Sequence, residues 1–171
     1  MWRHDYDQQP PFGFRNFVYF GETHNCVPLH DPCGAIAELK TEVSKYPAAL
    51  KTTILTDGFW GVEFTIWARE GYLASGDVFN AAGCMTRAAQ YLIRALFALN
   101  EEYFLSDKHA MGILSGLAWI PREVVPRLND ALVRHSLAEI RRLWAESVAL
   151  TDGAYVPRFD LTAFKVESSS S

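Results

Sequence analysis

Five polar side chains recur at helical spacing between residues 77 and 94, and their types suit the binding of a polar or anionic small molecule. These are Asp77, Asn80, Arg87, Tyr91 and Arg94. Guanidinium groups bind carboxylates, phosphates and sulfates through paired hydrogen bonds, while the carboxylate, the amide and the phenol add further polar contacts. The alternative is a solvated helix face, which usually carries Glu and Lys in i,i+4 pairs. Both interpretations stay open, and the first makes these five residues candidate substrate-binding residues.

A second polar group follows at residues 100–108. Its Asn100, Tyr103 and Lys108 are further candidate substrate-binding residues, and the alternative is a helix end with charged caps. Asn100 falls among apolar helix positions, so we expect its amide to be buried and to bind backbone or side-chain partners. The sequence has no interpretable Ser-His-Asp or Cys-His pair and no glycine-rich phosphate loop, so we assign no catalytic residue.

Two short segments contain residue types that bind metal ions. The first holds His24, Cys26, His30 and Cys33, and the second holds Asp5 and Asp7. Structural zinc sites usually combine two ligand pairs from separate segments, which favours a simple turn at the first. An Asp-x-Asp pair binds magnesium when a strand holds it, whereas this pair precedes Gln-Gln-Pro-Pro and favours a solvated terminus. We therefore predict no metal site and no cofactor held by this chain alone.

The composition predicts one soluble globular domain. The chain has 171 residues, 49% of them hydrophobic and 21% charged, and it has no apolar run long enough to cross a membrane. A formal net charge of −4 gives no general attraction to nucleic acid or to anionic lipid. Three cysteines without a Cys-x-x-Cys pair indicate reduced thiols, so we expect a cytoplasmic protein.

The hydrophobic periodicity predicts a mainly α fold, a helical bundle with a long central amphipathic helix. We expect helices at 35–46, 48–69, 76–104, 109–119 and 127–133, and a last helix that begins after Ser136 with a Ser-Glu capping box. Gly58 and Gly61 are candidate break points in the second of these helices. Met85, Ala89, Leu92, Leu96 and Leu99 form the apolar face of the central helix.

The first 33 residues differ from the rest and predict a short β-ribbon. Two β-like runs, 17–20 and 26–29, flank a polar turn. An isolated two-stranded ribbon is marginal in water, so it must lie against the helical body or against another chain's sheet. The predicted organisation is a ribbon or partner-docking arm at 1–33, a helical bundle at 34–151 and a tail at 152–171.

Several ordered motifs between about residues 26 and 120 resemble the helical C-terminal, substrate-binding domain of small-molecule nucleotidyltransferases, the antibiotic-modifying type. They are His30-Asp31-Pro32-Cys33-Gly34-Ala35, Tyr46-Pro47-Ala48-Ala49-Leu50, Gly76-Asp77-Val78-Phe79, Leu96-Phe97-Ala98-Leu99-Asn100-Glu101-Glu102-Tyr103-Phe104 and Asp107-Lys108. The resemblance implies that Asp77, Asn100 and Lys108 match recurring polar positions of the family. In that family the N-terminal domain binds the nucleoside triphosphate and magnesium, and the helical domain binds the acceptor.

The chain lacks the phosphate-holding loop and usable metal carboxylates of that catalytic domain. One alternative is a piece of a longer enzyme. The other, which the unsupported ribbon favours, is a subunit of a heteromeric small-molecule-modifying enzyme whose partner supplies a nucleotidyltransferase-like half with its nucleotide and magnesium. Such a pair would suit natural-product biosynthesis, for example a ring closure that expels sulfate or phosphate, as in aziridine formation. A non-catalytic interaction module and a monomeric nucleotidyltransferase are further alternatives.

Overall fold

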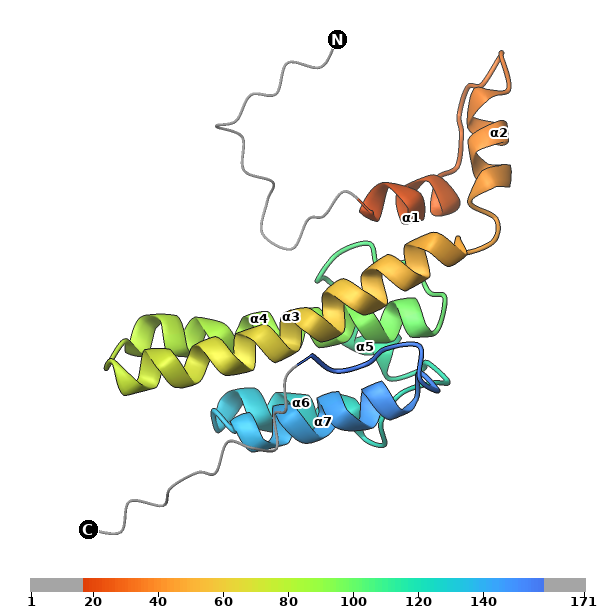
Figure 1. Ribbon diagram of the computed structural model, residues 1–171. Coiled ribbons are helices and arrows are strands. Elements are labelled where there is room, and N and C mark those ends of the chain that lie inside the picture. Colours follow the sequence, from red (N-terminus) through yellow and green to blue (C-terminus); the bar gives the residue numbers. More distant parts are fainter. Residues whose placement is uncertain (1–16, 159–171) are drawn as a thin grey trace, which may run out of the picture.

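The protein is an assembly of helices around one long helical hairpin (Figure 1). The computed structural model describes residues 17–158, and within this range it has seven helices and no strand. The helices are α1 (Val18–Asn25), α2 (Ala35–Glu42), α3 (Ala48–Ala74), α4 (Val78–Leu99), α5 (Ala110–Leu114), α6 (Val124–Val133) and α7 (Leu137–Ala149). The prediction of a mainly α bundle is confirmed. None of the helices that the structure describes is long and apolar enough to cross a lipid bilayer.

The predicted β-ribbon is wrong, because the first of its two runs lies in helix α1. A helix places Val18 and Gly21 on one face, and both are buried. A Cβ atom at Gly21 would lie only 2.9 Å from Cβ of Tyr103, so this face packs closely on the chain that follows α4. The apolar residues that made the run look like a strand are those that the helix buries on one face. Over only four residues, periodicity does not distinguish a helix from a strand.

The hairpin of α3 and α4 forms the centre of the core. Gly58 and Gly61, expected as break points, lie inside an uninterrupted helix. A Cβ atom at Gly58 would lie 2.9 Å from Cβ of Ala95, and one at Gly61 would lie 2.6–2.8 Å from ring carbons of Tyr91. These glycines therefore allow the two helix backbones to approach closely.

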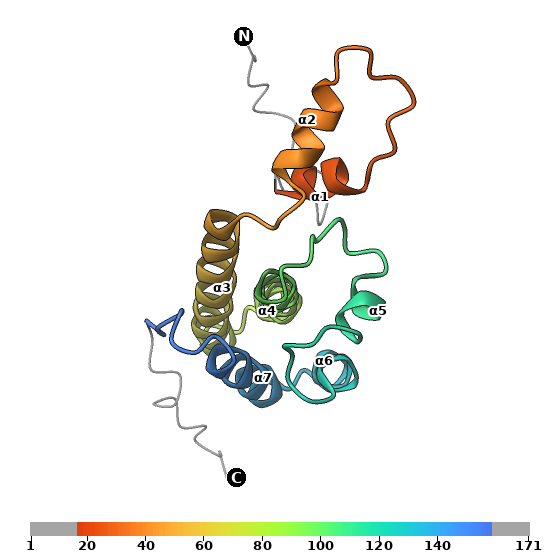
Figure 2. The same cartoon turned by 90° about the vertical axis from the view of Figure 1, so that its right-hand side faces the viewer.

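The apolar face of α4 is buried as predicted. Met85, Ala89, Leu92 and Leu96 are at most 3% exposed. The helix is shorter than expected, because Asp77 caps its start and Glu101, with a φ of 56°, turns the chain just after its end. Helices α6 and α7 lie below the hairpin in Figure 1, and α5 packs beside α4 at the same height, as Figure 2 shows.

Helices α1 and α2 form an N-terminal lobe, residues 18–45, at one end of the bundle (Figure 2). Helix α1 joins the core through Val18, whereas α2 projects away from it. Helix α2 has no buried residue and contacts mainly α1. The Lys40 ammonium group donates to three carbonyl oxygens at the end of α1, those of Thr23, His24 and Cys26 at 2.6–3.4 Å. Polar bonds to the end of a helix thus hold the lobe together in place of an apolar core.

The last helix begins as predicted, since the Ser136 side chain accepts a hydrogen bond from the backbone N–H of Glu139. After α7 the chain returns to α3, where the Tyr155 hydroxyl donates to the fully buried Glu63 carboxylate. The backbone N–H of Arg158 donates to the other Glu63 oxygen at 2.9 Å. Burial, followed by the bond to Glu63, raises the pKa of Tyr155.

The close approach of α3 and α4 leads to a prediction about paired glycine variants. Gly58→Ala should lower the free energy of unfolding by about 1–3 kcal/mol, because the new methyl group overlaps Ala95 and the carbonyl of Tyr91. Gly71→Ala in the same helix meets no atom of residues 17–158 within 4 Å and should raise it by about 0.5–1 kcal/mol through helix propensity. Urea denaturation followed by circular dichroism measures both, and equal effects would contradict this packing.

Candidate functional site

Three of the predicted site residues, Asp77, Asn80 and Arg87, lie in the first half of α4. The Asp77 carboxylate caps the helix, accepting from the backbone N–H of Asn80 at 3.0 Å and from its amide at 2.7 Å. These two bonds hold the pKa of Asp77 below its usual value. The Arg87 guanidinium folds back along its own helix and donates to Cys84 Sγ at 3.3 Å. Asp77 and Asn80 are therefore engaged in forming the helix start.

The next two predicted residues, Tyr91 and Arg94, are directed into the bundle. The Tyr91 ring packs where Gly61 leaves room between the two long helices. Arg94 is only 6% exposed, and its guanidinium carbon lies 5.6 Å from the centroid of the Phe104 ring. Such a contact is a cation–π interaction, which is strongest away from water. Both side chains contribute to packing, so the expected binding stripe along α4 is interrupted in its middle.

Asn100 has the backbone partners that the sequence predicts, but it is half-buried where burial was expected. Its side-chain amide donates to the carbonyls of Leu96 at 2.8 Å and Trp119 at 2.9 Å, and its oxygen accepts from the backbone N–H of Trp119 at 2.7 Å. The side chain thus joins the end of α4 to a loop 19 residues further along. These hydrogen bonds give the partly buried amide its backbone partners. They also hold together the two ends of the segment between Asn100 and Trp119.

Tyr103 connects the α4–α5 loop to the N-terminal lobe. Its hydroxyl donates to the carbonyl of Val43 at 3.1 Å, and its ring packs against His24 and Tyr46. Burial raises the pKa of the Tyr103 hydroxyl. The loop therefore lies beside the lobe, and its Lys108 side chain is exposed.

Five exposed polar side chains of this loop form what we call the polar edge. They are Glu101, Glu102, Asp107, Lys108 and His109. Glu101 accepts from the Lys51 ammonium at 2.8 Å. Glu101 and His109 have positive backbone φ values of 56° and 62°, which residues other than glycine rarely adopt. The polar edge is a fixed loop between α4 and α5 with charges of both signs.

The eight predicted residues do not form one site. Helix α4 has 22 residues, so its ends are roughly 33 Å apart. Asp77, Asn80 and Arg87 belong to the first half, whereas Asn100, Tyr103 and Lys108 lie at or beyond the far end. Of these eight, Lys108 combines exposure with the absence of a partner among residues 17–158. The end of α4 next to the lobe is therefore the candidate site.

The described part of the chain offers no ready metal site. Within residues 17–158, no three His, Cys, Asp or Glu side chains are grouped so that they could hold an ion. His24 is engaged instead with the carbonyl of Val43 at 3.0 Å, and Cys26 and Cys33 are exposed thiols without a disulfide. The Asp5 and Asp7 pair lies outside the described residues.

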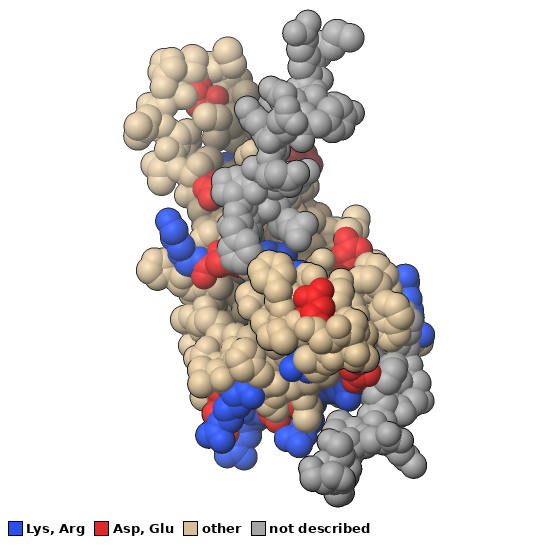
Figure 3. Space-filling model, turned by 90° about the vertical axis from the view of Figure 1, so that its left-hand side faces the viewer, with Lys and Arg blue, Asp and Glu red and all other residues tan. Residues whose placement is uncertain are grey.

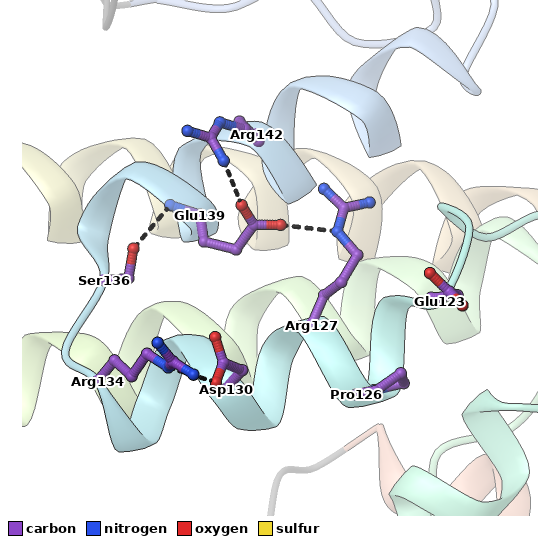
Figure 4. A pocket seen from close by; sticks show the side chains of 8 residues that line it. All are labelled: Glu123, Pro126, Arg127, Asp130, Arg134, Ser136, Glu139 and Arg142. Carbon is purple, nitrogen blue, oxygen red and sulfur yellow. Dashed lines mark hydrogen bonds and ion pairs between the residues drawn. The ribbon is translucent and has the colours of Figure 1, made fainter.

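A pocket of about 450 Å³ lies between α6 and α7 (Figure 4). Three arginines and three acidic residues line it together with Pro126 and Ser136. The Arg127 guanidinium donates to Glu139 at 2.7 Å and, with both terminal nitrogens, to Glu146 at 2.7 Å. Arg142 and Arg134 are likewise paired, with Glu139 and Asp130. The pocket is thus an ion-pair network that joins the two helices.

The charged residues are unevenly distributed over the surface. In Figure 3, which looks at the α3–α4 turn, most blue atoms lie in the lower part of the view and the centre is mostly uncharged. Leu73, Val78 and Phe79 at this turn are 48%, 71% and 86% exposed. Exposed apolar groups of this kind are typical of interaction surfaces when they lie together.

Two structural features were not predicted from the sequence. One is the buried Glu63, whose partners come from 92 and 95 residues away. The other is the aromatic stripe, which we define as Trp60, Phe64 and Trp67; these side chains are 37%, 43% and 48% exposed on the outer face of α3. The i, i+4, i+7 spacing was the available signal, but the same spacing is typical of a buried helix face.

Comparison with known proteins adds no relative: no family model, no curated protein and no solved structure matches the chain. The site is therefore interpreted from its own geometry.

The role of Asn100 leads to a stability prediction. Asn100→Ala removes the bonds to the carbonyl and the N–H of Trp119, which are exposed to water, and should lower the free energy of unfolding by about 0.5–1.5 kcal/mol. Asn129→Ala, at an exposed position of α6, is the matched control and should change little. Urea denaturation measures both. An Asn100→Ala protein as stable as the control would show that the bridge to Trp119 is unimportant.

The ion-pair network leads to a prediction about pH. Hydrogen bonds from Arg127 lower the pKa of Glu146, so the pair stabilises the fold above the ordinary carboxyl pKa and loses this effect as the pH falls through the lowered value. Glu146→Gln should therefore be less stable than the parent near neutral pH, by less than about 1 kcal/mol for so exposed a pair. The difference should vanish in acid. Glu102→Gln, at an exposed carboxylate outside the network, should show no such convergence in denaturation curves.

Proposed function

We propose that the protein is the helical subunit of a heteromeric enzyme that acts on a small polar or anionic molecule. In this proposal the N-terminal lobe binds the partner subunit, and the polar edge beside it completes the partner's active site. The observation that carries the proposal is the apolar surface of the lobe next to a fixed, charged loop.

The lobe has the surface of a docking element. Tyr19, Phe20, Val27, Leu29 and Leu39 are between 40% and 97% exposed, and α2 buries none of its residues. Val27 and Leu29 lie in a non-helical segment that contains Pro28. An extended segment with alternating apolar side chains suits addition to the edge of a partner's sheet, where main-chain bonds supply affinity and pockets supply specificity.

The polar edge lies where a docked partner would meet it. Tyr103 and Gly21 join the loop to the lobe, so a subunit bound to the lobe has the loop as its neighbour. The exposed Lys108 can bind a carboxylate, phosphate or sulfate group of the substrate, and the nearby carboxylates can bind its polar hydrogens. The supports at Asn100 and Tyr103 hold this loop in place, which lowers the entropy lost on binding.

The chemistry beyond binding is assigned to the partner. In this proposal the other subunit would hold any nucleotide and magnesium; within residues 17–158 no three His, Cys, Asp or Glu side chains are grouped to hold an ion. The resemblance to nucleotidyltransferase helical domains is consistent with this division, and it is the basis for proposing a natural-product enzyme, including the sulfate- or phosphate-expelling ring closure. A non-catalytic module that only stabilises its partner is the competing proposal, since the exposed lobe alone supports it equally.

The docking half of the proposal predicts a heteromer that depends on the lobe. Native mass spectrometry of the full chain, co-expressed with the protein encoded beside it, should show a complex of the two. Val27→Asp with Leu29→Asp should weaken this complex at least about tenfold, because two charges would be buried in the interface. Val133→Asp with Val156→Asp makes the same change at two exposed positions outside the lobe and should leave the complex intact. A partner bound equally by both double variants would contradict docking through the lobe.

The catalytic half predicts a different effect of Lys108. Lys108→Ala should leave the heteromer intact and lower kcat/KM of the complex at least about tenfold, because an anion-binding charge is lost. Arg87→Ala removes an exposed charge from the other half of α4 and should leave turnover unchanged. Equal turnover of the two variants in an intact complex would favour the stabilising module.

A further inference from the structure

The pocket between α6 and α7 contains one carboxylate that its ion pairs leave over. The three arginines that line the pocket are paired with Asp130, Glu139 and Glu146. Glu123, just before α6, lines one end of the pocket, and its side chain has no ion-pair or hydrogen-bond partner among residues 17–158 (Figure 4). A carboxylate without a partner at the end of a pocket is a binding group for a cation.

The arginines of the pocket keep hydrogen-bond donors that the ion pairs do not use. A guanidinium group has five N–H bonds. Arg142 donates to Glu139 through Nη1, which leaves its Nε and Nη2 without a partner in the described chain. Arg134 donates to Asp130 through Nε, which leaves its two terminal nitrogens. Two neighbouring nitrogens of a guanidinium group bind the two oxygens of a carboxylate side by side.

We propose that this pocket is a second ligand site, and that its ligand is a zwitterionic small molecule with an ammonium group at Glu123 and a carboxylate at Arg142. The proposal does not rest on the heteromer, because α6 and α7 lie on the opposite side of the hairpin from the N-terminal lobe (Figure 2). The pocket is lined by residues 123–142 alone, so the site is complete within one chain.

The charge balance of the pocket favours a ligand that carries both signs. Three arginines and three acidic residues line it, so it has no net charge to attract a simple anion or a simple cation. An anion bound at Arg142 also approaches Glu139, and a cation without a carboxylate meets the guanidinium groups unscreened. A zwitterion brings an opposite charge to Glu123 and to Arg142. A singly charged carboxylate is repelled less by Glu139 than a phosphate dianion is.

The dimensions of the pocket set the distance between the two charges of the ligand. Arg127 binds both Glu139 and Glu146, so Arg142, which lies between them on α7, is roughly level with Arg127. Arg127 is four residues from Glu123, or roughly 6 Å along α6. Packed helices are about 8–10 Å apart, and the side chains of both helices extend into the gap. The charges of the ligand should therefore be roughly 6–10 Å apart.

The space between the two charged ends suits a short methylene chain. The volume of about 450 Å³ is within the range of small-molecule pockets. Pro126 and the aliphatic part of Arg127 line the space between the ends and can pack against methylene groups. The backbone φ of Glu123 is 53°, a value that residues other than glycine rarely adopt and that is frequent at binding positions. An ω-amino acid such as 6-aminohexanoate combines these properties.

Isothermal titration calorimetry of the full chain with 6-aminohexanoate tests the proposal. The Kd should be about 1 mM or lower, as expected for so small a ligand with two charged contacts. Hexanoate and hexylamine each retain one of the two charges and should bind at least about tenfold more weakly. The absence of binding of 6-aminohexanoate at millimolar concentrations, or equally tight binding of hexanoate, would overturn the proposal.

A variant of Glu123 tests the ammonium end of the site. Glu123→Gln should raise the Kd of 6-aminohexanoate at least about tenfold, because the charge opposite the ammonium group is lost. The exchange breaks no ion pair of the described chain, so the fold should be retained. Glu102→Gln, at an exposed carboxylate outside the pocket, is the matched control and should leave the Kd unchanged. Parent-like binding by Glu123→Gln would overturn the proposal.

Variants of two basic residues test the carboxylate end and the location of the site. Arg142→Gln should raise the Kd of 6-aminohexanoate at least about tenfold and leave the affinity for hexylamine unchanged, because only the carboxylate contact is lost. Lys108→Ala, in the polar edge, should leave both unchanged. If Lys108→Ala abolishes binding while Arg142→Gln does not, the ligand binds at the polar edge and the pocket proposal fails, whatever the result for the heteromer.

Discussion

The close approach of α3 and α4 is the contact on which the rest of the structure depends. Gly58 and Gly61 remove the side chains that would separate the two backbones, and Tyr91 and Ala95 occupy the space. With α3 against one side of α4, the remaining apolar side of the hairpin is free for α5, α6 and α7. The polar groups at each end of α4 are consequently held far apart. The geometry that makes the core therefore excludes a single site along the helix.

The sequence predicted correctly those features that depend on residues within a single helix. The apolar face of α4, the Ser136 cap and the need of Asn100 for backbone partners all follow from spacing within a few residues. For the same reason, periodicity did not show what surrounds the residues of the polar stripe. Periodicity places Asp77, Arg87 and Arg94 on one face, but it does not show that one is a cap, one folds back on its own helix and one is buried against Phe104. What a neighbouring segment contributes is outside the reach of periodicity.

The remaining differences come from contacts between residues far apart in the sequence. Burial of Glu63 requires donors from the chain after α7, and Tyr103 is oriented by a carbonyl 60 residues earlier. The helix at Val18–Asn25 likewise depends on the room that Gly21 leaves for Tyr103 and Leu105. A segment of this composition has no decisive local preference, so its partner decides between helix and strand. Local rules therefore predicted the long helices and failed at the short N-terminal one.

The N-terminal lobe and the polar edge lie at the same end of the hairpin. The lobe precedes α3, and the polar edge lies beside the start of that helix, where Lys51 binds Glu101. Tyr103, in the same loop, donates to the carbonyl of Val43 in the lobe. In the proposed heteromer, a partner bound to the lobe would therefore meet the polar edge without any rearrangement of the hairpin.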